Sequence, residues 1–185
     1  MPKLPKADVV ETRRTYKWYT GEPVFEFGSG LHYTNFSVAI SPKSGMPSRF
    51  TASALLSQST GAAPYADLLP FWSVPVTVTN IGNATSDFAV LALLKGEFGP
   101  KPYPLKSLVA FTRLHDIEPG TSADATLDIQ LGSIARSDEK GNLVLWPGRY
   151  SLVLDTDGKD TWDFVIAGDA AVLDVLPPPR PGEMQ

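Results

Sequence analysis

The stretch Val74-Pro75-Val76-Thr77-Val78-Thr79-Asn80-Ile81-Gly82-Asn83 decides the fold class of this chain. Its valines alternate with proline and threonine, and this period of two is typical of a strand with one buried and one exposed face. The residues from Asn80 to Asn83 then supply the polar side chains and the glycine that tight turns prefer. The stretch therefore predicts one strand of a sheet, followed by a turn.

The same alternation recurs on both sides of this stretch. Strands are expected over residues 35–40, 71–80, 88–94, 105–114, 123–131, 143–155 and 161–166, with a short helix over residues 132–136. Residues 88–94 are apolar on both faces, as expected for a central strand. Turn residues separate the strands at roughly the 8–12-residue spacing of immunoglobulin-like sandwiches. The fold class is therefore predicted to be all-β, an immunoglobulin-like β-sandwich of about seven strands.

The alternation also predicts which side chains face the inside of the sandwich. The expected core residues are Val76, Val78, Phe88, Val90, Leu127, Ile129, Tyr150 and Leu152. Tyr150 follows Pro147-Gly148-Arg149 at the start of a late strand, where such sandwiches use a tyrosine corner. Its hydroxyl is expected to bond to a nearby backbone group, which makes Tyr150 a structural residue.

Composition excludes several classes of function. The chain has 185 residues, a formal net charge of −4 and no run of Lys or Arg longer than two, so it lacks the basic face that nucleic acid binding needs. No apolar stretch approaches the ~20 residues that span a bilayer, and residues 1–14 lack the apolar centre of a signal peptide. Neither nucleic acid nor a membrane is an expected partner. There are no cysteines, and His32 and His115 alone do not make a structural zinc site, so no metal or cofactor is expected.

Three segments follow from the distribution of aromatic, glycine and proline residues. Residues 1–33 are predicted to be an N-terminal connector, residues 34–176 the sandwich, and residues 177–185 a proline-rich tail that cannot extend a sheet. The connector is rich in large side chains: Tyr16, Trp18, Tyr19, Phe25, Phe27, Leu31, His32 and Tyr33. A connector this apolar is expected to lie on the surface of a neighbouring domain.

Three motifs carry a resemblance to a known family. They are Arg14-Thr15-Tyr16-Lys17-Trp18-Tyr19, Phe27-Gly28-Ser29-Gly30-Leu31-His32-Tyr33-Thr34 and Gly99-Pro100-Lys101-Pro102-Tyr103-Pro104-Leu105-Lys106. With these motifs the chain resembles the C-terminal fibronectin type III-like domain of glycoside hydrolase family 3, of the fungal β-xylosidase type. The resemblance covers about residues 13–179. Residues 1–12 show no resemblance to the family, which is expected of a truncated gene, a mis-split gene model or a free-standing relic.

The resemblance implies an accessory domain without catalytic residues. In this family the domain follows a TIM-like barrel, which carries an Asp nucleophile, and an α/β sandwich, which supplies the acid/base carboxylate. Neither motif has a counterpart here. The chain would be a fragment of an enzyme that resembles xylan 1,4-β-xylosidase, which releases xylose from xylo-oligosaccharides. The expected partners are the missing catalytic domains, through the aromatic connector, and xylan or xylo-oligosaccharide.

Two alternatives remain beside this interpretation. The chain could be a stand-alone carbohydrate-binding module, with Trp18, Tyr19, Trp72, Trp146 and Trp162 as a sugar-stacking platform, although burial is the commoner fate of such rings. It could instead be a structural interaction module. The family implies a secreted, extracellular protein, which would give meaning to the glycosylation sequons at Asn35 and Asn83.

Several acidic residues are expected to form turns and not to carry chemistry. Asp116 and Glu118 end one strand, and Asp155, Asp157 and Asp160 surround the tip of the final hairpin. The run from Asp155 to Asp160 faintly resembles a calcium loop, but Ile166 stands where such a loop has its bidentate Glu. His115 is expected at the surface. His32 is expected to pack against the α/β sandwich of the family.

Overall fold

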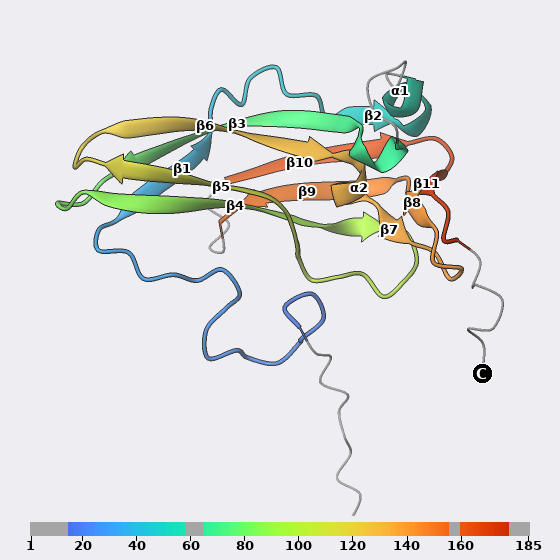
Figure 1. Cartoon of the computed structure of the whole chain (residues 1–185), viewed down its shortest axis with the longest axis horizontal. Helices are drawn as coiled ribbons and strands as arrows, with labels where there is room; N and C mark the ends of the chain where they lie inside the picture. The colour runs from blue at the N-terminus through green and yellow to red at the C-terminus, as the bar shows by residue number, and fades with distance from the viewer. Residues whose placement is uncertain (1–14, 58–64, 156–159, 178–185) are drawn as a thin grey trace, which may run out of the picture.

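A computed structural model describes residues 15–57, 65–155 and 160–177, and these residues form a β-sandwich (Figure 1). One sheet has the strand order β1-β3-β6, and the facing sheet has the order β2-β10-β9-β4-β5. The three strands of the first sheet are β1 (Phe36–Ile40), β3 (Pro70–Asn80) and β6 (Ser122–Gln130). The five strands of the second are β2 (Arg49–Thr51), β4 (Ser86–Phe98), β5 (Ser107–Ile117), β9 (Gly148–Leu154) and β10 (Asp160–Ala167). The predicted all-β sandwich is confirmed.

A third, small sheet and three short helical segments close one end of the sandwich. The sheet has the order β11-β8-β7 and consists of β7 (Arg136–Ser137), β8 (Leu143–Leu145) and β11 (Ala171–Asp174). The helical segments are α1 (Ala52–Ser57), the 3-10 helix η1 (Ala66–Leu68) and α2 (Leu131–Ile134). The expected helix over 132–136 is thus present, one residue earlier at its start.

The core lies between the two large sheets. All eight residues predicted from alternation are buried there, each with at most 2% of its surface exposed. In β3 the buried residues Val74, Val76 and Val78 alternate with half-exposed partners, as the period of two requires. The core prediction is confirmed.

Tyr150 occupies the predicted corner at the start of β9. Its hydroxyl donates a 2.6 Å hydrogen bond to the backbone oxygen of Trp146. Its ring stacks between Phe98, at 4.0 Å between centroids, and Phe164, at 5.1 Å. Burial raises the pKa of the Tyr150 phenol well above its ordinary value, so the group stays a neutral donor.

One strand prediction is wrong. Residues 143–155 were expected to form a single strand, but β8 and β9 belong to different sheets and are separated at Trp146 and Pro147. Pro147 has no amide hydrogen to give to a ladder, and the Trp146 indole nitrogen donates to the backbone oxygen of Arg136, 3.1 Å away. The chain therefore changes sheets at this point.

Replacing Tyr150 by Phe should lower the free energy of unfolding by about 1–3 kcal/mol. The variant keeps the stacked ring but leaves the partly buried Trp146 carbonyl without its donor. Urea denaturation measures the difference. Tyr65→Phe is the matched control, since the Tyr65 side chain is 65% exposed and should leave the midpoint unchanged. An unchanged midpoint for Tyr150→Phe as well would mean that the hydroxyl contributes nothing.

Candidate functional site

The connector, here residues 15–35, runs along the outside of the sandwich before it enters β1 (Figure 1). Its first turn is attached to the start of β5. The Leu105 amide donates to the backbone oxygen of Lys17 at 2.8 Å, and the Leu108 amide donates to the Tyr16 hydroxyl at 3.1 Å. Although it lies outside the sheets, the connector is thus hydrogen-bonded to the domain.

Two further contacts stabilise this attachment. The rings of Tyr16 and Phe27 stack with 3.8 Å between their centroids, which folds the connector into a loop. The Lys106 ammonium lies 2.8 Å from the Glu26 carboxylate. The hydrogen bond and the charge of Lys106 lower the pKa of Glu26, so this carboxylate stays ionised.

The five-stranded sheet has a buried apolar patch on its outer face. Leu93 and Val153 are register partners in β4 and β9 and point away from the core, because their chain neighbours are the residues that point into it. Their exposed fractions are nevertheless only 1% and 5%. The other register partner of Leu93 is Leu108, whose amide donates to Tyr16. We infer that the Tyr16 loop covers this outer patch.

The far end of the connector is attached through Asn80, whose side chain is fully buried. The Asn80 Oδ1 atom accepts hydrogen bonds from the Thr34 hydroxyl at 2.9 Å and from the Gly82 amide at 3.0 Å. The Ile81 amide also donates to the Asn35 backbone oxygen at 2.9 Å. Gly82 permits this close approach, because an added Cβ would meet the Thr34 hydroxyl and lie 2.8 Å from the Asn35 nitrogen.

His32 packs on the sandwich itself. Its ring stacks on Phe88 at 4.9 Å and meets the edge of Phe36 at 5.4 Å. The side chain is still exposed on its other side. The expectation that His32 packs against another domain therefore applies only to the outward side of its ring.

The predicted interface residues separate into two groups. Tyr16 and Trp18 are half-buried, whereas Tyr19, Phe25, Phe27, Leu31 and Tyr33 are exposed. The exposed fractions of Phe25, Leu31 and Tyr33 are 80%, 101% and 92%. Together with Val24, which is 91% exposed, these three side chains form what we call the outward face of the connector.

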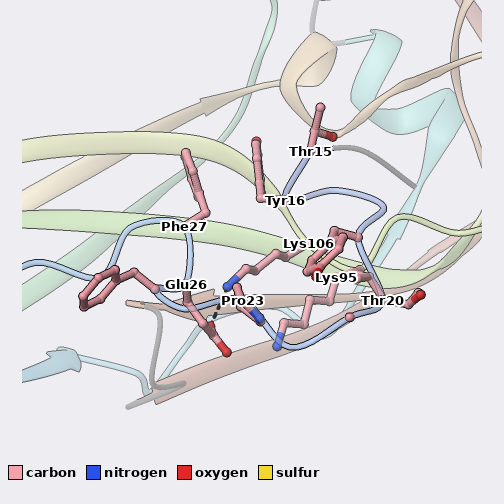
Figure 2. Close-up of a pocket in the computed structure, with 12 residues that line it drawn as sticks. Thr15, Tyr16, Thr20, Pro23, Glu26, Phe27, Lys95 and Lys106 are labelled. Carbon is pink, nitrogen blue, oxygen red and sulfur yellow. Dashed lines mark hydrogen bonds and ion pairs between the residues drawn. The ribbon is translucent and has the colours of Figure 1, made fainter. Parts of the chain in front are cut away.

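An open hollow of about 890 Å³ lies between the connector loop and the sheet (Figure 2). Rings of the connector line it, namely Tyr16, Tyr19, Phe25 and Phe27. The sheet side contributes Lys95 from β4, together with Leu105 and Lys106 from the segment before β5. Figure 2 draws Lys95 and Lys106 beside Glu26, with the Lys106–Glu26 ion pair as a dashed line.

Glu118 takes part in a turn, as expected, whereas Asp116 lies inside strand β5, near its end. Asp116 adopts a φ of 53°, a left-handed conformation that Asp tolerates, and the Glu118 backbone oxygen accepts from the Thr121 amide at 3.1 Å. The carboxylate that organises this surface is Asp87, which sequence reasoning did not single out. It accepts from the Asp116 amide at 3.1 Å and lies 2.9 Å from Nδ1 of His115, and these bonds lower its pKa. His115 is exposed, as predicted.

Asp160 is a structural residue of the final hairpin. Burial alone would raise its pKa, but bonds from Lys43 and from the Ile40 and Thr161 amides outweigh it and lower the pKa. Asp157, in the segment that faintly resembles a calcium loop, lies outside the described residues. Within the described residues, no group of three or more His, Cys, Asp or Glu side chains could hold a metal ion.

The tryptophans do not form one sugar-stacking platform. Trp162 is 4% exposed and its indole nitrogen donates to the Pro47 backbone oxygen, so its faces are not available to a sugar. Trp72 is half-buried and packs against Trp162. Trp146 is also half-buried, and its backbone oxygen accepts the hydrogen bond of the Tyr150 hydroxyl. The connector does carry exposed rings, and Tyr65 and Phe111 are exposed elsewhere on the sandwich, at 65% and 72%. Asn35 and Asn83 are both exposed, so their sequons are accessible.

Comparison with known proteins identifies the domain. The two facing sheets define a fibronectin type III-like module, and β-glucosidase from Listeria innocua contains a similar fold, with a TM-score of 0.62 at 19% identity over 80% of this chain. A structure of a family 3 exo-β-xylosidase in complex with a xylobiose aziridine probe matches 88% of this chain with a TM-score of 0.81 and 36% identity. No protein-family model matches the chain.

Curated relatives agree with this structural match. The chain is 39% identical over 162 residues to exo-1,4-β-xylosidase of Aspergillus oryzae and 42% identical over 169 residues to a probable exo-1,4-β-xylosidase of Neosartorya fischeri. These matches cover 86% and 90% of this chain but only 20% and 21% of the relatives. The chain therefore corresponds to the C-terminal part of the fungal exo-β-xylosidases of glycoside hydrolase family 3, about a fifth of their length. The described residues contain no helix that is long and apolar enough to cross a membrane.

Replacing Gly82 by Ala should loosen the end of the connector that is attached at Asn80. The new methyl group would displace Thr34 and so remove its bond to Asn80. Hydrogen exchange of the Ile81 amide, which donates to the Asn35 backbone oxygen, should accelerate by roughly tenfold or more, which corresponds to ~1.4 kcal/mol of local stability. Gly30→Ala is the matched control, because a Cβ at Gly30 has no neighbour within 4 Å. Equal protection in both variants would contradict the role given to the Asn80 contacts.

Proposed function

We propose that the chain is a non-catalytic accessory module that packs against the preceding domains of a family 3 β-xylosidase. The observation that carries this proposal is the outward face of the connector, where Phe25, Leu31 and Tyr33 project from a backbone bonded to the sandwich. Several exposed aromatic and aliphatic side chains within one short segment are typical of an interface. The relatives extend well beyond this region, so preceding domains exist in them to cover such a face.

The energetics favour a covered outward face. Burying one large apolar side chain completely stabilises a structure by roughly 1.5–3 kcal/mol, a large fraction of the marginal stability of a domain. Part of this gain is lost to ordering the interface, but here the connector is already ordered by Asn80, Tyr16 and Lys106. A preorganised apolar surface therefore loses little entropy when a neighbouring domain packs on it.

The proposed parent enzyme releases xylose from xylo-oligosaccharides outside the cell. This proposal is supported by the relatives, which are named exo-1,4-β-xylosidases. Because the chain corresponds to only a fifth of those enzymes, we place the reacting carboxylates in the preceding domains. The isolated chain is accordingly expected not to hydrolyse aryl β-xylosides.

A hybrid enzyme tests the docking proposal. In it, residues 15–185 replace the C-terminal fifth of the Aspergillus oryzae exo-xylosidase. The Phe25→Ser and Leu31→Ser substitutions together should lower the free energy of unfolding of the hybrid by ~2 kcal/mol or more, because each removes a large buried side chain. Thermal denaturation and the rate of aryl β-xyloside hydrolysis measure the effect.

The same double substitution in the isolated chain provides the contrast. There the two side chains face water, so the stability should not fall and binding of a hydrophobic dye should decrease. Val172→Ser is the control in the hybrid, since Val172 is 53% exposed on β11 and lies outside the connector. A hybrid that tolerates both changes as well as it tolerates Val172→Ser would refute the docking proposal.

Secretion of the chain predicts glycans at Asn35 and Asn83. Both side chains are exposed, and the two sites are close together because the Ile81 amide bonds to the Asn35 backbone oxygen. Expression through a yeast secretory pathway should add glycan to both positions, and Asn35→Gln and Asn83→Gln should each remove one. Intact-mass spectrometry before and after endoglycosidase treatment measures this. A secreted chain without any glycan would contradict the prediction.

A second candidate function is binding of xylan or xylo-oligosaccharide. The observation that favours it is the ring-lined hollow beside the connector, because aromatic faces pack on the apolar side of a pyranose. Its volume of about 890 Å³ lies within the usual range of small-molecule sites. The rings concerned are Tyr19 and Phe27, in place of the buried tryptophans.

A further inference from the structure

The hollow beside the connector has more positive than negative charge. Among the residues that line it, Lys95, Lys106 and Glu26 are the charged ones. Glu26 is paired with Lys106, and the charge of Lys95 also contributes to the low pKa of Glu26, so all three groups act in one place. Two ammonium groups against one carboxylate leave a surplus of one positive charge. An occupant with one negative charge would balance it.

Ring faces stand beside these charges. Tyr19 is 36% exposed and Phe27 is 39% exposed, so both can accept another flat apolar surface. The Tyr19 ring lies against Gly21, because a Cβ at Gly21 would meet that ring. Phe27 is stacked on Tyr16, which forms the rest of the aromatic wall. The hollow therefore combines a wall for ring stacking with donors for an anion.

We propose that this hollow binds a pyranose that carries a carboxylate, that is, a uronic acid unit of a polysaccharide. The inference rests on the second candidate function and names its ligand class. Lys95 and Lys106 donate to the sugar carboxylate, while the apolar face of the pyranose packs on Tyr19 and Phe27. Each ammonium has three donor hydrogens, so Lys106 can bind the ligand without releasing Glu26.

The same residues disfavour other ligands. A phosphate group has no flat apolar face and would leave the rings without a partner, and its second charge would be repelled by the Glu26 carboxylate in the lining. A neutral sugar would use the rings but leave the surplus charge unbalanced. A singly charged sugar acid satisfies both parts of the lining.

Two glycosides with the same ring test the proposal. Methyl β-D-glucuronide and methyl β-D-glucoside differ only in the group at C6, a carboxylate in the first and a hydroxymethyl group in the second. Titration of the full chain, followed by amide NMR shifts, should place the glucuronide at Tyr19, Lys95 and Lys106, with at least threefold tighter binding than the glucoside. Added salt should weaken binding of the glucuronide but not of the glucoside, because salt screens the attraction between the lysines and the carboxylate.

Two lysine variants separate the effect of the Lys95 charge on binding from any effect on the fold. Lys95→Met should weaken glucuronide binding by roughly three- to tenfold and leave glucoside binding unchanged, because Lys95 is exposed and its removal does not affect the core. Lys101→Met is the matched control, as Lys101 is an exposed lysine that does not line the hollow. Both variants should keep the denaturation midpoint of the parent chain.

The outcomes distinguish this inference from the function on which it rests. Equal binding of both glycosides would support a sugar site and overturn its selectivity for acids. If neither glycoside shifts the amide signals of Tyr19, Lys95 and Lys106, both the sugar site and its selectivity for acids would be overturned. Glucuronide binding that Lys101→Met weakens as much as Lys95→Met would show a general effect of charge and would also overturn the assignment.

Discussion

The buried amide of Asn80 is the contact on which the arrangement of this domain depends. Its nitrogen donates to the backbone oxygens of Ala84 and Ile117, each at 2.8 Å, and its oxygen accepts from Thr34 and Gly82. One side chain thus connects the turn between β3 and β4, the end of β5 and the last residues of the connector. All four hydrogen-bonding positions of the amide are used, which removes the cost of burying it.

Sequence alternation was enough to predict the sandwich because strand periodicity records which face is buried. It identified the inner residues of β3 and β6, and the position of Tyr150. It failed where backbone chemistry overrides periodicity, as at Pro147, where an apolar run divides between two sheets. It also missed β2, whose three residues lie in a stretch rich in serine and proline and pair in parallel with β10.

The candidate site was only partly predictable. The aromatic connector was evident from composition, and the apolar outer face of β4 was noted as typical of a central strand. What the sequence could not reveal is that these two features belong together. The Tyr16 hydroxyl accepts from the amide of Leu108, the register partner of Leu93, although Tyr16 and Leu108 are far apart in the chain. The same holds for Glu26 and Lys106, which are 80 positions apart and whose ion pair depends on the tertiary fold. Local patterns do not record such pairings.

The double attachment of the connector has a mechanical consequence. Its first turn is bonded next to β5, in one sheet, and its last residues to Asn80, in the other. A linker held at both ends in this way cannot act as a hinge. If the preceding domain moves, the connector and the sandwich are therefore expected to move together as one rigid body. Relative movement of this module and its neighbours would therefore need a pivot at or before Thr15.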